Sequence, residues 1–284
     1  MISDKDTVIT ISSSRVQYGK YNDRLYLIDY HLDDEPEKIV TELGKLREKY
    51  GYSKIFCKVP DFAMPVFLQA GFTVEAFVPR FYRNMNGCFF MSRFYNGRDM
   101  ILNEEKEYFE ALATVIRSVE PIPVFPMKPD MVIRPFAAEE NGIIASHLGS
   151  IFRSYPFPVS DPDFIAQTMD EGTVYFGAYV EEKLAGVTSA EFYTENGAAE
   201  MTDFAVLPEY RGQKVAQSLL FFMEDWVKNT SEITTLYTIA RLRETGMNVV
   251  FKRGNYSFCG TLVNNTRIGS GIESMNVFYK HLDR

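Results

Sequence analysis

A short loop, Arg211-Gly-Gln-Lys-Val-Ala216, is the part of the sequence best suited to chemistry. It follows an apolar stretch that ends in Leu207-Pro208, and it leads directly into apolar residues at helical spacing. The first amides of a helix have no partners within the helix, and the helix dipole makes that end positive. The sequence therefore predicts a binding site for an anion, such as a phosphate or a diphosphate, at this loop.

The order of strand, proline turn, Arg-Gly loop and amphipathic helix resembles the acyl-CoA site of the GCN5-related N-acetyltransferases, the GNAT superfamily. Their loop has Gln or Arg, two further residues, Gly, one residue, and then Gly or Ala. Arg211 and Ala216 match this pattern, Gly212 suits a tight loop, and Lys214 stands where the family has Gly. A glycine there leaves φ unrestricted. We expect Lys214 to fit with a negative φ, its ammonium then reaching a phosphate.

The resemblance implies that acetyl-CoA is the co-substrate and that no metal is needed. It implies cofactor contacts from the strand end, the loop and a later helix, namely from Phe204, Ala205, Val206, Arg211, Gly212, Gln213, Lys214, Val215, Ala216 and Asn248. Strand amides near Ala205 and Val206 are expected to donate to the acetyl carbonyl. Asn248 matches a family position that contacts the pantetheine arm.

Acetyl transfer to an alkyl amine calls for a general base. Such an ammonium has a pKa of about 10.4, so only about one molecule in a thousand is the free amine at neutral pH. Some family members carry a Glu six residues before the last apolar strand residue, and counting back from Val206 reaches Glu200. Strand alternation places Glu200 on the face of Phe204 and Val206, with Asp203 opposite. We predict Glu200 as the catalytic base, with Glu191 as the second candidate and a solvated strand end as the alternative.

The leaving thiolate needs a proton donor. Many family members use a Tyr on the helix before the final Gly-aromatic pair, but Asn248-Val-Val-Phe-Lys-Arg-Gly254 contains none. Tyr256, just past that glycine, is the predicted substitute. Packing in the core is the alternative for this residue.

A wider set of motifs resembles the β-lysine N-acetyltransferases. These motifs are Tyr155-Pro-Phe-Pro158, Met201-Thr-Asp-Phe-Ala205, Met247-Asn248, residues 260–266 and residues 273–279. The resemblance spans most of the chain. It implies direct acetyl transfer from acetyl-CoA to the terminal (epsilon) amine of β-lysine, giving the compatible solute N-epsilon-acetyl-β-lysine.

A pocket for β-lysine must bind a carboxylate and a second amine. We predict that Tyr155, Phe157, Glu191 and Arg80 line it. Two alternatives stay open. One is an acetyltransferase for another amine, such as a polyamine, an aminoglycoside or a protein lysine. The other is a non-catalytic acyl-CoA sensor, which Lys214 and the missing helix tyrosine would favour.

The 284 residues carry a net charge of −8 at pH 7. This charge argues against nucleic acid or an anionic membrane as partner. The cysteines and histidines are isolated and show no metal-ligand or disulfide spacing. No signal-peptide pattern and no membrane-length apolar run occur, so we expect a cytoplasmic protein. The expected partner is a small-molecule amine, with a homodimer as a further prediction.

The prolines in Pro121-Ile-Pro-Val-Phe-Pro-Met-Lys-Pro129 predict an extended linker. We expect a divergent GNAT-like α/β domain over residues 1–125 and a catalytic GNAT domain over 130–284, its mixed, mostly antiparallel sheet flanked by helices. Residues 67–75 and 251–258 both predict a helix, a glycine, an aromatic residue and a strand. The first half is therefore either a degenerate copy, lacking the Arg-Gly loop and unable to bind the cofactor, or a chance similarity.

Hydrophobic periodicity and turn residues predict the individual elements. The expected strands are 8–12, 25–30, 54–59, 73–78, 88–94, 131–134, 174–180, 184–193, 198–207, 234–240, 256–263 and 272–279. The expected helices are 36–49, 62–70, 104–119, 139–153, 162–169, one from the loop to about 228, and 247–252. Asn86-Gly87 is expected to form the turn before strand 88–94.

Overall fold

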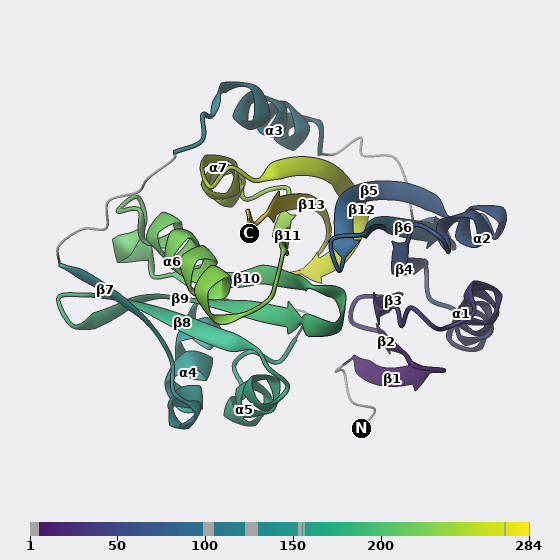
Figure 1. The fold of residues 1–284 in the computed structure, drawn as a ribbon, viewed down its shortest axis with the longest axis horizontal. Coiled ribbons are helices and arrows are strands. Elements are labelled where there is room, and N and C mark those ends of the chain that lie inside the picture. The colour runs from purple at the N-terminus through teal and green to yellow at the C-terminus, as the bar shows by residue number, and fades with distance from the viewer. Residues whose placement is uncertain are drawn as a thin grey trace.

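The structure is a computed structural model that describes residues 6–98, 105–122, 130–152, 155, 157–269 and 271–283. Within these residues, the strands form one continuous 13-stranded sheet (Figure 1). Their order is β1-β2-β3-β4-β6-β5-β12-β13-β11-β10-β9-β8-β7, so the two halves of the chain occupy separate stretches of the sheet. None of the described helices combines the length and apolar character that a membrane crossing requires.

The first half contributes one edge of the sheet. Its strands are β1 (Thr7–Ile11), β2 (Ser14–Gly19), β3 (Arg24–Asp29), β4 (Lys54–Pro60), β5 (Thr73–Tyr82) and β6 (Asn86–Phe94). Helix α1 (Pro36–Tyr50) joins β3 to β4, and α2 (Met64–Gln69) joins β4 to β5. Pro36 lies in the first turn of α1, where its missing amide costs no hydrogen bond, and left-handed Gly51 ends the helix.

The second half contributes the other strands. They are β7 (Met131–Pro135), β8 (Val174–Val180), β9 (Lys183–Tyr193), β10 (Ala198–Val206), β11 (Thr235–Arg241), β12 (Ser257–Ile268) and β13 (Gly271–His281). Its helices are α4 (Asn141–Ile151), α5 (Pro162–Asp170), α6 (Val215–Thr230) and α7 (Thr245–Arg253). Figure 1 shows α6 on one face of these strands and α4 and α5 on the other.

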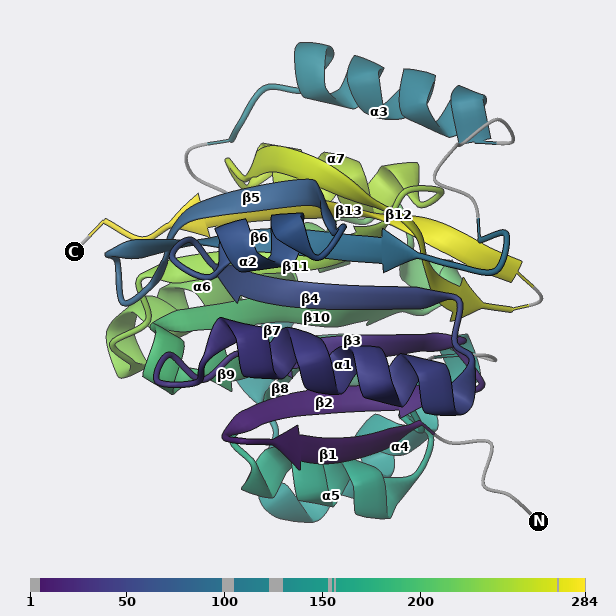
Figure 2. The same cartoon turned by 90° about the vertical axis from the view of Figure 1, so that its right-hand side faces the viewer.

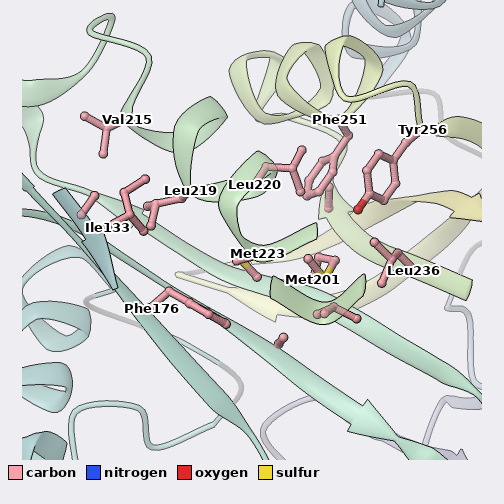
Figure 3. Packing of buried hydrophobic residues seen from close by; sticks show 14 of the residues in the cluster. Ile133, Phe176, Met201, Val215, Leu219, Leu220, Met223, Leu236, Phe251 and Tyr256 are labelled. Atoms are coloured by element: carbon pink, nitrogen blue, oxygen red, sulfur yellow. The ribbon is translucent and has the colours of Figure 1, made fainter. Parts of the chain in front are cut away.

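The main hydrophobic core of the second half lies between α6 and the sheet (Figure 3). Helix α6 carries buried apolar residues at helical spacing, namely Val215, Leu219, Leu220, Met223 and Val227. They pack against residues of the strands and α7, including Ile133, Phe176, Met201, Leu236 and Phe251. Each such buried side chain contributes about 1.5–3 kcal/mol to folding. This burial fixes the start of α6, and with it the Arg-Gly loop.

The two halves repeat the same pairing pattern, as the internal echo suggested. β3 pairs with β4 in parallel across α1, and β10 pairs with β11 in parallel across α6. On either side, β1-β2-β3 corresponds to β8-β9-β10, and β4-β6-β5 corresponds to β11-β13-β12. The halves join where β5 pairs antiparallel with β12 at Ala76 and Gly260. A Cβ at Gly260 would lie 2.1 Å from the Glu75 carbonyl oxygen, so only glycine permits this approach.

A second core lies between the two halves. Tyr26, Phe56 and Phe90 enter it from the first half, and Tyr193 and Tyr237 enter it from the second. Figure 2 views the molecule from the side of the first half. Because these rings come from facing parts of one curved sheet, polar side chains among them are removed from water.

Helix α3 (Lys106–Ser118) follows the first half in sequence but packs on the second, over α7 (Figure 1). Its Leu112 joins the core beneath α6. Arg243 Nε donates to Glu105 Oε1 at 3.1 Å, just ahead of α3. The predicted domain boundary falls within residues 123–129, which lie outside the described residues.

The expected elements agree with the structure apart from their ends, with two exceptions. β2 was not expected, and the Asn86-Gly87 turn is wrong, because both residues lie in β6. The turn is made by Arg83 and Asn84, whose φ angles are 52° and 57°. Residues 104 and 153, the expected ends of two helices, lie outside the described residues.

Candidate active site

The Arg-Gly loop between β10 and α6 passes twice through the left-handed region. Gly212 has a φ of 76°, and Lys214, which immediately precedes α6, has a φ of 68°. The negative φ expected at Lys214 is therefore wrong. A non-glycine residue in this conformation costs about 1–2 kcal/mol. The backbone thus follows the path that glycine would favour, although the residue is lysine.

Helix α6 begins without a side-chain cap. Its first internal hydrogen bond runs from the Ser218 amide to the Lys214 carbonyl at 3.0 Å, so the amides of residues 215–217 have no acceptor within the helix. Arg211 is exposed, and its Nε donates to the Val206 carbonyl at 3.3 Å, which ties the loop to the end of β10. The amides and the helix dipole together form an accessible site for an anion.

The parallel strands β10 and β11 separate beside this loop. They pair only where Ala198–Glu200 meets Thr235–Tyr237, while β11 stays paired with β13 along its length. Beyond that point a β-bulge between Thr202 and Ala205 displaces β10 relative to β9. His147 Nε2 on α4 lies 3.1 Å from the Ala205 carbonyl oxygen and holds the bulged end. Among the described strands, none pairs with that edge of β10 beyond Glu200, and an extended ligand can lie there.

The bulge also reverses the alternation of side chains along β10. Asp203 within it has a φ of 54°. Beyond it, Phe204 and Val206 pack into the core beneath α6, whereas Glu200 lies on the other face. The expected common face for Glu200, Phe204 and Val206, with Asp203 opposite, is therefore wrong. An extra residue in a bulge shifts the two-residue period, which brings Asp203 round to the side of Glu200.

Three carboxyl groups gather on this face, and we call Glu191, Glu200 and Asp203 the acid cluster. Glu200 and Glu191 are direct cross-strand partners on β10 and β9. Asp203 accepts hydrogen bonds from the Tyr155 hydroxyl at 2.7 Å and from Ser189 Oγ at 2.8 Å. Glu200 and Asp203 are each 9% exposed. Like charges placed opposite each other in a sheet repel, so the cluster favours protons or a cation.

Burial and neighbouring charges shift the pKa values of the two glutamates, Glu191 and Glu200. Burial, reinforced by Glu200 and Asp203, raises the pKa of Glu191 to about 8. Burial also raises the pKa of Glu200, but the nearby Lys58 ammonium and a hydrogen bond from Tyr237 oppose that rise. Lys58 opposes the rise at Glu191 as well, so the two glutamates titrate as a coupled pair that favours retaining one proton and leaves one carboxylate able to accept another.

A buried cation from the first half completes the cluster. Lys58 on β4 is 2% exposed, and its ammonium donates to the Tyr237 hydroxyl at 3.0 Å. The same ammonium lies 4.0 Å from the ring centroid of Tyr193, whose hydroxyl donates to Glu191 Oε2 at 3.4 Å. The sequence analysis missed Lys58. The sequence feature that could have identified it is the pair Lys54 and Lys58, which lie on one face of an otherwise apolar strand.

Known proteins resemble this chain along most of its length. The β-lysine N(6)-acetyltransferase of Methanococcus maripaludis is 32% identical over 97% of this chain and 98% of its own. The N-acetyltransferase YodP of Bacillus subtilis is 30% identical over 94% and 95%. The β-lysine N(6)-acetyltransferase of Methanosarcina mazei is 33% identical over 53% and 55%. The family model for the acetyltransferase (GNAT) family matches residues 136–253.

The chain belongs to the GNAT acetyltransferase family. It is an acetyl-CoA-dependent N-acetyltransferase with the GNAT fold. Its residues fit this donor: the amides of residues 215–217 suit the diphosphate, and the gap between β10 and β11 suits an extended arm. The described residues contain no group of three His, Cys, Asp or Glu side chains placed to hold a metal.

The acetyltransferase buries Tyr256 away from the acid cluster, against its expected role as proton donor. The side chain is 1% exposed, and its ring centroid lies 5.4 Å from that of Phe251 in the core beneath α6 (Figure 3). Its hydroxyl lies beside Glu224, which is paired with Lys280 at 2.7 Å. Burial raises the pKa of Tyr256 well above its usual value. The structure supports the packing alternative.

Asn248 was expected to contact the pantetheine arm, but its polar atoms are engaged inside the enzyme. Its amide nitrogen donates to the carbonyls of Arg241 at 3.2 Å and Glu244 at 3.0 Å, and its oxygen accepts from Asn276 at 2.9 Å. These bonds fix the connection between β11 and α7. A cofactor contact from this residue stays a prediction.

Two of the four residues expected at the acceptor, Tyr155 and Glu191, lie in or against the acid cluster. The other two lie elsewhere. Phe157 packs in the apolar core of α4 and α5, and Arg80 is exposed near His281 at the opposite end of β11 from the loop. Among these residues, the structure therefore favours Tyr155 and Glu191 as contacts for an acceptor.

Proposed function

We propose that this enzyme transfers the acetyl group of acetyl-CoA to the terminal (epsilon, N6) amine of β-lysine, giving N-epsilon-acetyl-β-lysine. Two relatives carry this activity in their names, one of them matched along nearly the full length of both chains. The observation that carries the proposal is the buried acid cluster beside the gap between β10 and β11.

The charge of this cluster favours a cationic acceptor. Two of its three carboxyl groups, those of Glu191 and Glu200, are influenced by the buried ammonium of Lys58, whereas the neighbours of Asp203 are the hydroxyls of Tyr155 and Ser189. An unpaired buried carboxylate is costly, so the cluster retains protons or accepts a cation. β-Lysine brings two ammonium groups. An ammonium bound near Glu200 and Asp203 would offset the negative charge, whereas a neutral acceptor would not.

Glu200 is the proposed general base. Deprotonating an ammonium of pKa about 10.4 at neutral pH costs roughly 4 kcal/mol, which a nearby base reduces. Glu200 lies at the last pair of the β10–β11 ladder, immediately next to the gap. The amides near Ala205 and Val206 are the proposed donors to the acetyl carbonyl.

The loop is the proposed site for the diphosphate of acetyl-CoA, which supplies the acetyl group. The amides of Lys214, Val215 and Ala216 would bind it. The Gln213 amide donates to the Tyr210 carbonyl at 3.3 Å, so Gln213 would shape the loop together with Arg211 and Gly212. Phe204 and Val206 bury their side chains in the core, so only their backbone atoms are proposed as contacts.

We also propose two structural units, residues 1–125 and 130–284, the second of them catalytic. Helix α3 belongs to the first unit in sequence and contacts α7 of the second. A cytoplasmic location and a homodimer are further parts of the proposal. A mass of 32.6 kDa by sedimentation, equal to that of one chain, would rule out the homodimer.

Turnover of acetyl-CoA against an amine panel tests the proposed acceptor. The panel holds β-lysine, α-lysine, spermidine, an aminoglycoside and a lysine-containing peptide, with release of free thiol as the readout. We expect kcat/KM for β-lysine to exceed the others by about tenfold or more, with mass spectrometry locating the acetyl group on N6. Better turnover of another amine would show that this amine, and not β-lysine, is the acceptor. If the protein binds coenzyme A but releases thiol with none of the amines, the alternative function of a non-catalytic acyl-CoA sensor would hold.

A further inference from the structure

The first half of the chain places a single buried ammonium, that of Lys58, against the acid cluster of the second. Lys58 lies on β4, 179 residues before its hydrogen-bond partner Tyr237. Tyr237 is also the cross-strand partner of Glu200 on β10, and its hydroxyl lowers the pKa of that carboxyl. Because the ammonium donates to the tyrosine oxygen, the tyrosine hydroxyl remains able to donate to the carboxylate. The three groups therefore form a chain from cation to carboxylate.

The environment of Lys58 differs from that of the other buried lysine on the same strand. Lys54 pairs with Glu75 at 3.0 Å and also donates to the Val263 carbonyl at 2.7 Å. Lys58 has no carboxylate within 4.0 Å among the described residues and is surrounded by the rings of Tyr26, Tyr193 and Tyr237. A buried ammonium without a direct partner is costly. Burial accordingly lowers the pKa of Lys58, and the neighbouring carboxyls of Glu200, Asp29 and Glu191 oppose that fall and favour the charged ammonium.

We infer that Lys58 is a positioning residue of the acceptor site, which through Tyr237 keeps Glu200 in its ionised, proton-accepting form. The first half thus completes the catalytic site of the second. This inference rests on the role proposed for Glu200. Hydrogen-bond chains in a low-dielectric interior polarise one another, which lets a cation act on a carboxylate it does not touch.

The balance at Glu200 depends on groups from several packed elements. These are Lys58 on β4, Tyr26 on β3, Glu191 and Tyr193 on β9, Asp203 on β10 and Tyr237 on β11. The two carboxyl neighbours disfavour ionisation of Glu200, and Lys58 is the only one of these groups that carries positive charge. Its loss would leave Glu200 protonated to a higher pH.

Substitution of Lys58 tests this inference through the pH dependence of kcat/KM for β-lysine. In Lys58→Met we expect the acidic limb of the pH profile of kcat/KM to move up by about one pH unit or more. At pH values below this limb, kcat/KM should fall about tenfold relative to the wild type, and the difference should shrink at high pH. Lys58→Arg should restore most of the profile. The matched control is Lys54→Met combined with Glu75→Gln, which removes a buried lysine from the same face of β4. The acidic limb of the pH profile of this control should stay at its wild-type position.

Two further measurements keep the test decisive. Tyr237→Phe retains the Lys58 ammonium but removes the hydroxyl between Lys58 and Glu200. We expect the acidic limb of the pH profile to shift in the same direction by a smaller amount. A ¹³C NMR titration of the glutamate carboxyls in the enzyme alone, with the Glu200 signal assigned by Glu200→Gln, reads the same pKa without turnover. A folded Lys58→Met with an unchanged Glu200 pKa overturns the inference, as does an equal shift in the Lys54 control. If β-lysine is not acetylated at all, the proposed function fails and the NMR titration still decides the role of Lys58.

Discussion

Glu200 on β10 and Glu191 on β9 are direct cross-strand partners on a buried face of the sheet. Two carboxyls in such a position do not both ionise easily, so the pair titrates as a coupled unit. Burial raises the pKa of both carboxyls, and Lys58 opposes the rise at both, helped by Tyr193 at Glu191 and by Tyr237 at Glu200. One cross-strand pair therefore provides a carboxylate ready to take a proton from an acceptor ammonium.

Glu200→Gln tests the base directly. We expect kcat/KM at pH 7 to fall by about 10²–10⁴, since a positioned base contributes that much. Above about pH 9 the loss should shrink, because more of the acceptor is already the free amine. Thiol release measured at both pH values gives the answer, with exposed Glu139→Gln as the control. Equal losses at the two pH values would remove Glu200 from this role.

Glu191→Gln should change how stability depends on pH. The folded protein retains the Glu191 proton up to a pH of about 8, whereas the unfolded chain loses it near 4.5. The free energy of unfolding therefore decreases as pH rises through that interval. Glutamine has no proton to lose, so the variant should lose less stability between pH 5 and 9. Urea unfolding across this range measures the difference, and parallel curves for the two proteins would contradict the assignment.

Lys214→Gly and Lys214→Pro test the conformation of the loop. Glycine keeps the left-handed φ and relieves strain, so we expect up to about 1 kcal/mol of added stability and nearly unchanged use of acetyl-CoA. Proline fixes φ near −65° and should raise the KM for acetyl-CoA at least about tenfold. Steady-state kinetics and thermal unfolding give both quantities.

The control for this pair is Glu182→Gly. Glu182 has a φ of 64° in the turn between β8 and β9, outside the Arg-Gly loop. It should gain similar stability and leave the KM for acetyl-CoA unchanged. A wild-type KM in Lys214→Pro would show that the loop does not bind the donor.

Tyr256→Phe separates packing from proton donation. The ring stays in the core beneath α6, so we expect unfolding to change by about 1 kcal/mol and kcat to stay within about twofold. Tyr256→Ala should instead cost about 3–5 kcal/mol through the cavity that it leaves. A hundredfold loss of kcat in the phenylalanine variant would restore the tyrosine as the proton donor.

Local patterns predicted the helices and the loop well. Pro36 and Gly51 bound α1, and the apolar spacing from Val215 onward defines α6, because caps and periodicity act over one or two turns. These features depend on neighbours in sequence. Glu200 was reached by counting back from Val206 in the family resemblance, and its role as the base stays a prediction.

Features that depend on distant partners were missed. The bulge at Asp203 depends on how β10 pairs with β9, and no local pattern around it marks the change of face. Lys58 meets Tyr237 only because the two halves fold against each other. The φ of Lys214 shows tertiary context overriding an intrinsic preference, since the packing of α6 holds the residue before it.

The two halves belong to one polypeptide chain, and they meet where Ala76 on β5 pairs with Gly260 on β12. Residues that meet across a subunit interface separate when protein is diluted, whereas residues in one chain keep a constant effective concentration. The Lys58 ammonium on β4 therefore stays beside the Tyr237 hydroxyl at any enzyme concentration. Specific activity on a cationic amine should accordingly be independent of dilution, even if larger assemblies dissociate.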